Sequence, residues 1–187
     1  MDKGRSTDPA PSTDEAPSTK DQGRITSAEC DNYTGVGRFI CLDVGERRIG
    51  VAVSDLTGTL ARPIRALRTS GLDGDALQLS AAEVSRLAAE DPLDAIVVGF
   101  PRRLDGSPNE MTPRIERFAA RLHERTGLAV ILQDERLTSV EAESRLATRE
   151  KNWRVRKEQL DAAAAAVILQ DYLDAHPRGI DADPRQS

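Results

Sequence analysis

Carboxylates lie at the margins of three apolar segments of this sequence, where charged side chains are unusual. Asp43 lies inside a strand-like apolar run, and the pair Asp134-Glu135 ends another. Asp161 directly precedes five consecutive alanines. A carboxylate next to a core is costly unless a cation or hydrogen bonds compensate its charge. Oxygen ligands of this kind suit hard divalent ions such as Mg²⁺, which can polarise a phosphodiester, so the pattern predicts metal chemistry.

Each of these carboxylates also has a structural interpretation that the sequence leaves open. Asp43 could cap the turn at Gly45, and the acidic pair could be the solvated end of a strand. Asp161 could interact with a helix dipole. Because successive strand residues point to opposite faces, only one of Asp134 and Glu135 can face a site, and we favour Glu135.

Basic residues near the same segments are candidates for nucleic-acid binding. Arginine and lysine can neutralise phosphates, and an aromatic ring can stack on an unpaired base. The alternative is that the charges are solvated and that the tryptophan anchors a loop to the domain. The candidates follow the first strand, follow Pro101 or precede Asp161, and they are Arg47, Arg48, Arg102, Arg103, Trp153, Arg154, Arg156 and Lys157.

Hydrophobic periodicity predicts the elements that must position these side chains. Three strands open the domain, the first two joined as an antiparallel hairpin, and helices then alternate with strands. This order predicts an α/β fold with a mixed five-stranded sheet, helices on both faces and the first strand between the second and the fourth. The expected strands are 38–44, 48–54, 63–69, 93–100 and 128–133, and the expected helices are 73–90, 108–125, one opened by a capping box at Thr138 and Glu141, and 156–175.

Length and composition predict one domain in a chain of 187 residues with a net charge of −5. We expect a disordered tail over 1–37, rich in Ser, Thr, Pro, Asp and Gly, a domain over 38–176 and a short tail over 177–187. Two cysteines without ligand spacing, no membrane-spanning run and no secretory signal favour a cytoplasmic protein. Neither His123 nor His176 belongs to a ligand cluster, which disfavours zinc.

Four segments together resemble the YqgF/RuvX family of RuvC-like proteins with an RNase H fold. They are 43–55, 98–107, 134–139 and 160–170. The resemblance implies an RNase H-like nuclease domain in which Asp43, the acidic pair 134/135 and Asp161 supply the metal-binding carboxylates. With Glu135 favoured within the pair, we expect Asp43, Glu135 and Asp161 to be catalytic and to bind Mg²⁺ or Mn²⁺. It further implies a nuclease of ribosome biogenesis that processes the 5′ end of pre-16S rRNA. We expect structured RNA or branched DNA as partner, no membrane, and a monomer or homodimer.

Three other functions compete with this interpretation. The first is a Holliday-junction resolvase-like DNA endonuclease, and the second is a non-catalytic RNase H-like factor that binds nucleic acid. The third is a lobe of an actin-like ATPase, because the segment from Asp43 to Val53 also resembles a phosphate loop. The ATPases need two such lobes, and a core of this length has room for one.

Overall fold

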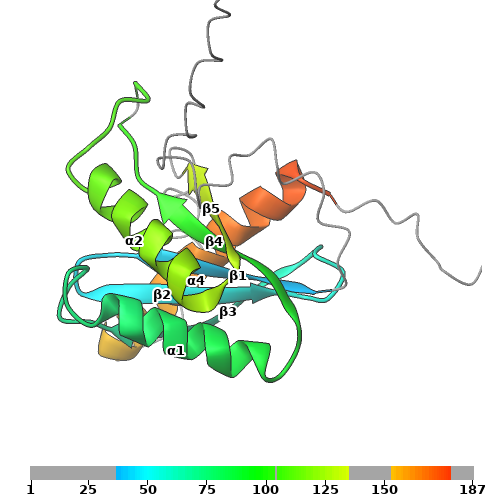
Figure 1. The fold of residues 1–187 in the computed structure, drawn as a ribbon. Coiled ribbons are helices and arrows are strands. Elements are labelled where there is room, and N and C mark those ends of the chain that lie inside the picture. The colour runs from blue at the N-terminus through cyan, green and yellow to red at the C-terminus, as the bar shows by residue number, and fades with distance from the viewer. Residues whose placement is uncertain (1–36, 104, 135–152, 178–187) are drawn as a thin grey trace, which may run out of the picture.

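Five strands form a single mixed sheet in the computed structural model, which describes residues 37–103, 105–134 and 153–177 (Figure 1). Side chains are described for these residues except 153–157. The elements are β1 (Arg38–Val44), β2 (Arg48–Ser54), β3 (Ala61–Arg68), α1 (Ala76–Ala88), β4 (Leu93–Phe100), α2 (Thr112–Thr126), β5 (Ala129–Asp134) and α4 (Trp153–Ala175).

The strand order is β3-β2-β1-β4-β5. β1 pairs antiparallel with β2 and parallel with β4, and β2 pairs antiparallel with β3. β1 therefore lies between the second and the fourth strand, as predicted. This topology, with helices on both faces, confirms the expected RNase H-like fold. The carboxyl ends of the parallel strands β1, β4 and β5 share one edge of the sheet, where ligand sites of open α/β sheets lie.

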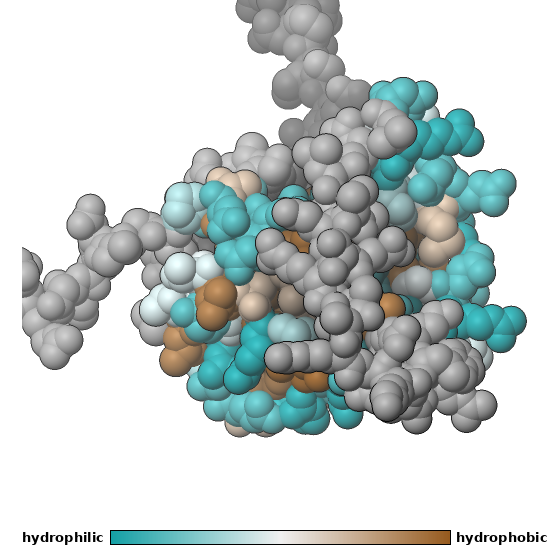
Figure 2. Space-filling model, turned by 180° about the vertical axis from the view of Figure 1, so that it is seen from behind, coloured by the Kyte–Doolittle hydropathy of each residue, from teal (hydrophilic) through white to brown (hydrophobic). Residues whose placement is uncertain are grey.

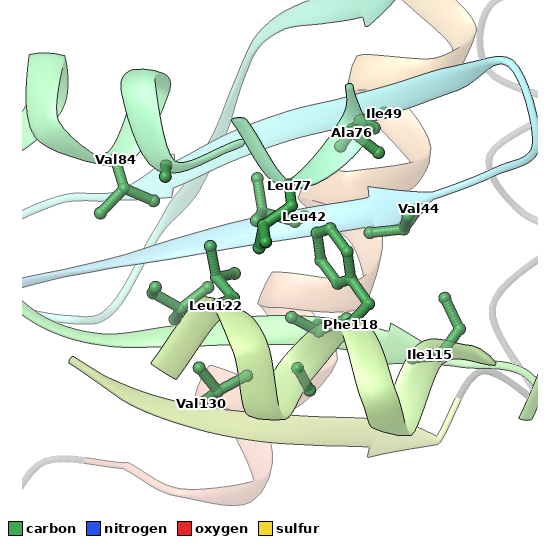
Figure 3. Close-up of a cluster of buried hydrophobic side chains, with 14 of the residues drawn as sticks. Leu42, Val44, Ile49, Ala76, Leu77, Val84, Ile115, Phe118, Leu122 and Val130 are labelled. Atoms are coloured by element: carbon green, nitrogen blue, oxygen red, sulfur yellow. The ribbon is translucent and has the colours of Figure 1, made fainter. Parts of the chain in front are cut away.

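Alternation along β1 assigns its side chains to two separate cores. Ile40 and Leu42 lie in the core beneath α1 and α2, together with Phe118 and Leu122 of α2 (Figure 3). The intervening residues of β1 face α4, where its buried side chains pack on the sheet. Asp43 belongs to this second face, two residues after the buried Cys41.

The outer surface carries few large apolar side chains. Figure 2 shows the side opposite to that of Figure 1, where hydrophilic residues form most of the coloured rim and apolar residues appear as smaller patches. Among the described residues, Leu56 and Leu60 are the exposed large hydrophobic side chains. None of the helices that the structure describes is both long and apolar enough to cross a bilayer.

Helix α1 begins at Ala76, three residues later than predicted. Asp75 holds the preceding turn, because its Oδ1 accepts hydrogen bonds from the Ser70 backbone N–H (2.8 Å) and the Thr69 hydroxyl (2.6 Å). Gly71 takes a φ of 138° there, which an L side chain rarely adopts. The predicted helix included residues 73–75, whereas in the structure these residues form the turn.

The remaining predicted bounds agree within a few residues. β3 begins two residues earlier than expected, α2 begins four residues later, and α4 begins three residues earlier. The helix expected at Thr138 and Glu141 lies outside the described residues. Residues 1–36 also lie outside the described residues, and the domain bounds therefore stay predictions.

A buried glutamate joins α1 to the edge strand β3. The side chain of Glu83 is only 2% exposed and forms ion pairs with Arg65 of β3 and Arg86 of α1. Burial raises the pKa of Glu83, but hydrogen bonds from Arg86 and Arg65 outweigh this effect and hold the pKa below its usual value. A lowered pKa means that the ionised form stabilises the fold, so this contribution is present above the ordinary pKa and is lost as the pH falls.

Glu83→Gln is therefore expected to lower the free energy of unfolding at pH 7 by about 2 kcal/mol, since both arginines lose their buried partner. The loss should shrink as the pH is lowered below 4.5, where the carboxylate of the wild type itself takes up a proton. Urea titrations at several pH values measure both effects. Glu90→Gln is the matched control, because exposed Glu90 pairs with the same Arg86. Equal losses in the two variants would contradict a special role for the buried pair.

Candidate functional site

A glycine in β2 lets α4 bring Asp161 next to Asp43. Gly50 lies directly opposite Asp43 in the β1–β2 register, so both positions belong to the face that α4 covers. A Cβ at Gly50 would lie 2.0 Å from the backbone oxygen of Asp161 and 3.3 Å from Cβ of Ala165. The helix backbone therefore rests directly on this position. A glycine inside a strand often marks such a close approach, a signal that the sequence interpretation did not use.

The two carboxylates interact electrostatically. Burial raises the pKa of Asp43 to about 6, and the negative charge of Asp161 contributes to the rise. Two acidic side chains that repel each other form an arrangement that a cation stabilises. Their oxygens are donors of the type that Mg²⁺ and Mn²⁺ prefer, so the chemistry of this pair fits a divalent ion.

Arg48 contacts Asp161, one member of this pair. It is the first residue of β2, and its Nε lies 3.3 Å from Oδ2 of Asp161, with the side chain 24% exposed. The opposite residue in the β2–β3 register, Arg68, forms a 2.7 Å ion pair with Glu158 of α4. These two pairs attach the first half of α4 to β2 and β3. Arg48 was predicted to bind nucleic acid, and the structure gives it a contact with a proposed catalytic residue, while Arg47 is exposed in the turn.

The third predicted carboxylate, Glu135, lies outside the described residues. Its neighbour Asp134 pairs with Phe100 of β4, and Phe100 belongs to the core beneath α1 and α2. Paired residues of parallel strands share a face, so Asp134 points away from the face of Asp43. Within the described ranges, no group of three or more Asp, Glu, His or Cys side chains forms a metal cluster.

The other predicted basic residues lie at the carboxyl edge or at the start of α4. Arg102 and Arg103 are exposed after β4, and the guanidinium of Arg102 lies 4.9 Å from the centre of the Phe100 ring. The backbone N–H of Arg103 donates to the oxygen of Ser107 (3.0 Å), which closes the loop. The first turns of α4 contain four further candidates, whose side chains lie outside the described set: Trp153, Arg154, Arg156 and Lys157.

Comparison with known proteins gives the same assignment as the four sequence segments. A protein of Burkholderia lata named "Putative pre-16S rRNA nuclease" is 46% identical over 136 residues, which are 73% of this chain and 88% of that protein. A protein of Burkholderia ambifaria with the same name is 47% identical over 71% of this chain and 85% of its own length.

Among solved structures, RuvC of Thermus thermophilus in complex with a Holliday junction substrate matches 74% of this chain and 95% of its own. Its TM-score is 0.41 and its sequence identity 16%. The RuvX family, described as Holliday junction resolvase, matches residues 37–175. The chain therefore belongs to the RuvX family.

Proposed function

We propose that this protein is a divalent-metal-dependent nuclease that processes the 5′ end of pre-16S rRNA. The observation that carries the proposal is the convergence of Asp43 and Asp161 across Gly50, where burial and mutual repulsion raise the pKa of Asp43. The relatives named as pre-16S rRNA nucleases support the choice of substrate.

In this proposal, Asp43, Glu135 and Asp161 hold Mg²⁺ or Mn²⁺. Asp134 faces the opposite side of the sheet, which leaves Glu135 as the member of the acidic pair that we assign to the site. A bound divalent ion would supply Lewis-acid activation of the scissile phosphate and of the attacking water. Arg48 balances the negative charge of Asp161. The exposed Arg102 and Arg103 would contact phosphates at the carboxyl edge.

A DNA substrate is the second candidate, because the family is described as Holliday junction resolvase. A non-catalytic nucleic-acid-binding factor is the third. We consider it weaker, because burial and the nearby charge of Asp161 raise the pKa of Asp43, so ionised Asp43 costs stability at neutral pH unless a bound cation offsets that cost.

Parallel cleavage assays test these alternatives with the same protein preparation. We expect cleavage of a precursor 16S rRNA fragment near its mature 5′ end with Mg²⁺ or Mn²⁺, and none with EDTA. Faster cleavage of a four-way DNA junction would favour the resolvase activity. Binding of both substrates with cleavage of neither, under all metal conditions, would contradict the proposal and favour the binding factor.

A further inference from the structure

Helix α2 carries a row of arginines beside its buried face. Arg114, Arg117, Arg121 and Arg125, here called the arginine stripe, are spaced by three, four and four residues. At 3.6 residues per turn this spacing confines them to an arc of about 80°. The buried residues of α2, such as Ile115 and Leu122, form the neighbouring arc. The stripe is therefore a single linear surface.

Part of the stripe lines a small cleft between α2 and the segment that leads into α1. Arg114, Arg117 and Arg121 face Leu72, Asp73 and Leu77 across it, with Phe118 beneath. Arg114 is neutralised by Asp73, with Nη2 lying 3.2 Å from its Oδ2. The two other arginines, Arg117 and Arg121, form no ion pair with any described residue, and both are exposed.

This local positive charge contrasts with the rest of the molecule. The whole chain has a net charge of −5, so the stripe does not reflect a generally basic protein. Several other arginines of the described residues have acidic partners, among them Arg38, Arg48, Arg65, Arg68 and Arg86. Uncompensated guanidinium groups in a row are an arrangement suited to an extended anion.

The stripe begins close to the edge that carries Asp43 and runs away from it. α2 follows β4 through the loop that contains Arg102 and Arg103, and the hydroxyl of Thr112 donates to the Pro101 oxygen (2.9 Å) at the carboxyl end of β4. From this edge, the stripe extends over the face opposite to α4 (Figure 1). Arg114 and Arg121 are seven residues apart, about 10 Å along the helix axis.

We propose that the arginine stripe binds the phosphate backbone of the nucleic-acid substrate, on a segment that flanks the bond held at the Asp43–Asp161 site. This inference rests on the proposed function. A polyanionic strand fits better than an acidic peptide, because it can continue from Arg102 and Arg103 along a line of further arginines. Each guanidinium fork matches a phosphate and carries no base specificity, so the stripe would add affinity on any sequence.

The test measures binding of a fluorescein-labelled RNA hairpin with single-stranded flanks, in EDTA, at 50–300 mM salt. Arg117→Gln and Arg121→Gln are each expected to weaken binding about 3-fold, and the double variant about 10-fold. The double variant should lower the slope of log affinity against log salt by about 1.5, because two phosphate contacts are lost. The double lysine variant should keep most of the slope, since it keeps the charge. Arg62→Gln, at an exposed β3 arginine outside the stripe, is the matched control and should bind like the wild type.

Wild-type affinity and slope in the double glutamine variant would overturn the proposal, as would an equal loss in Arg62→Gln. A double variant that binds the RNA normally but no longer binds poly-glutamate would assign the stripe to an acidic protein partner and overturn it too. A wild type that cleaves nothing but binds RNA through the stripe would refute the nuclease function and retain only the binding of the phosphate backbone by the stripe.

Discussion

Asp43→Asn is expected to lower the rate of metal-dependent cleavage at least about 1,000-fold. The metal-free variant should at the same time be more stable than the wild type at neutral pH. Loss of a metal ligand removes several kcal/mol of transition-state stabilisation, and each 1.36 kcal/mol is a factor of ten in rate. The gain in stability has a separate cause. The asparagine carries no charge, so it avoids the cost of burying a charge and does not repel Asp161.

The pH dependence of this gain follows from the direction of the pKa shift. The pKa of Asp43 rises from its ordinary value of 3.8 to about 6 in the folded protein. A raised pKa means that the folded state binds the proton more tightly than the unfolded state does. The associated stability is fully present below pH 3.8 and is lost as the pH rises through about 6. The free energy of unfolding of the variant should therefore exceed that of the wild type by about 1–3 kcal/mol at pH 8, and the difference should vanish near pH 4.

Thermal melts with and without Mn²⁺, run beside the cleavage assay, measure all three effects. Mn²⁺ should raise the melting temperature of the wild type, through binding to the native state, and should leave that of Asp43→Asn unchanged. Asp134→Asn is the matched control, because Asp134 lies on the opposite face of the sheet and should keep cleavage. A destabilised Asp43→Asn variant that Mn²⁺ still stabilises would refute the metal site and leave Asp43 as a turn cap.

The contact between Arg48 and Asp161 makes the second carboxylate a less clear probe. If repulsion by Asp43 were its only interaction, Asp161→Asn would preserve or raise metal-free stability, as we expect for Asp43→Asn. In the structure the same substitution relieves the repulsion of Asp43 but weakens the 3.3 Å ion pair with Arg48. These two effects have opposite signs. Stability changes in Asp161→Asn therefore do not discriminate between the two interpretations, whereas its loss of cleavage still does.

The sheet, and the face of the sheet on which Asp43 lies, could be predicted from the sequence because both follow from local patterns. Alternation along β1 separates Asp43 and Cys41 from Ile40 and Leu42. The antiparallel start followed by two crossovers then leaves few topologies. The small alanine side chains after Asp161 allow a helix to pack close to the sheet, and the backbone of α4 does approach Gly50 closely.

The ion pairs could not be predicted in the same way, because they depend on side chains that are distant in sequence. Arg48 was expected to begin the second strand and to bind nucleic acid, but its guanidinium contacts Asp161, more than one hundred residues later in the sequence. Glu83 lies within the predicted helix 73–90, where no local pattern indicates that it is buried beside Arg65 of β3. The arginine stripe had a helical spacing visible in the sequence, but its significance depends on the cleft beside α1.

Gly50→Ala tests whether α4 must rest on β2 for the site to form. In most strands, alanine in place of glycine would stabilise the protein by about 0.5–1 kcal/mol, because glycine has the greater freedom when unfolded. Here the added Cβ would lie 2.0 Å from a backbone oxygen, that of Asp161, and a backbone atom cannot rotate away. The helix must move outward and lose packing against the sheet. We expect a loss of about 3 kcal/mol in the free energy of unfolding.

The displacement should also disrupt the site, because the atom that would clash belongs to a proposed ligand. Gly50→Ala should therefore lose stabilisation by Mn²⁺ even at temperatures where it remains folded. Gly127→Ala serves as the control. Its φ of 71° strains a side chain, but no atom lies within 4 Å of the added Cβ, so it should cost about 1 kcal/mol and keep the metal response. A Gly50→Ala variant as stable as the wild type, with its Mn²⁺ response intact, would show that α4 does not need this contact. The convergence of Asp43 and Asp161 would then rest on other contacts of α4 with β2, such as the ion pair between Arg48 and Asp161.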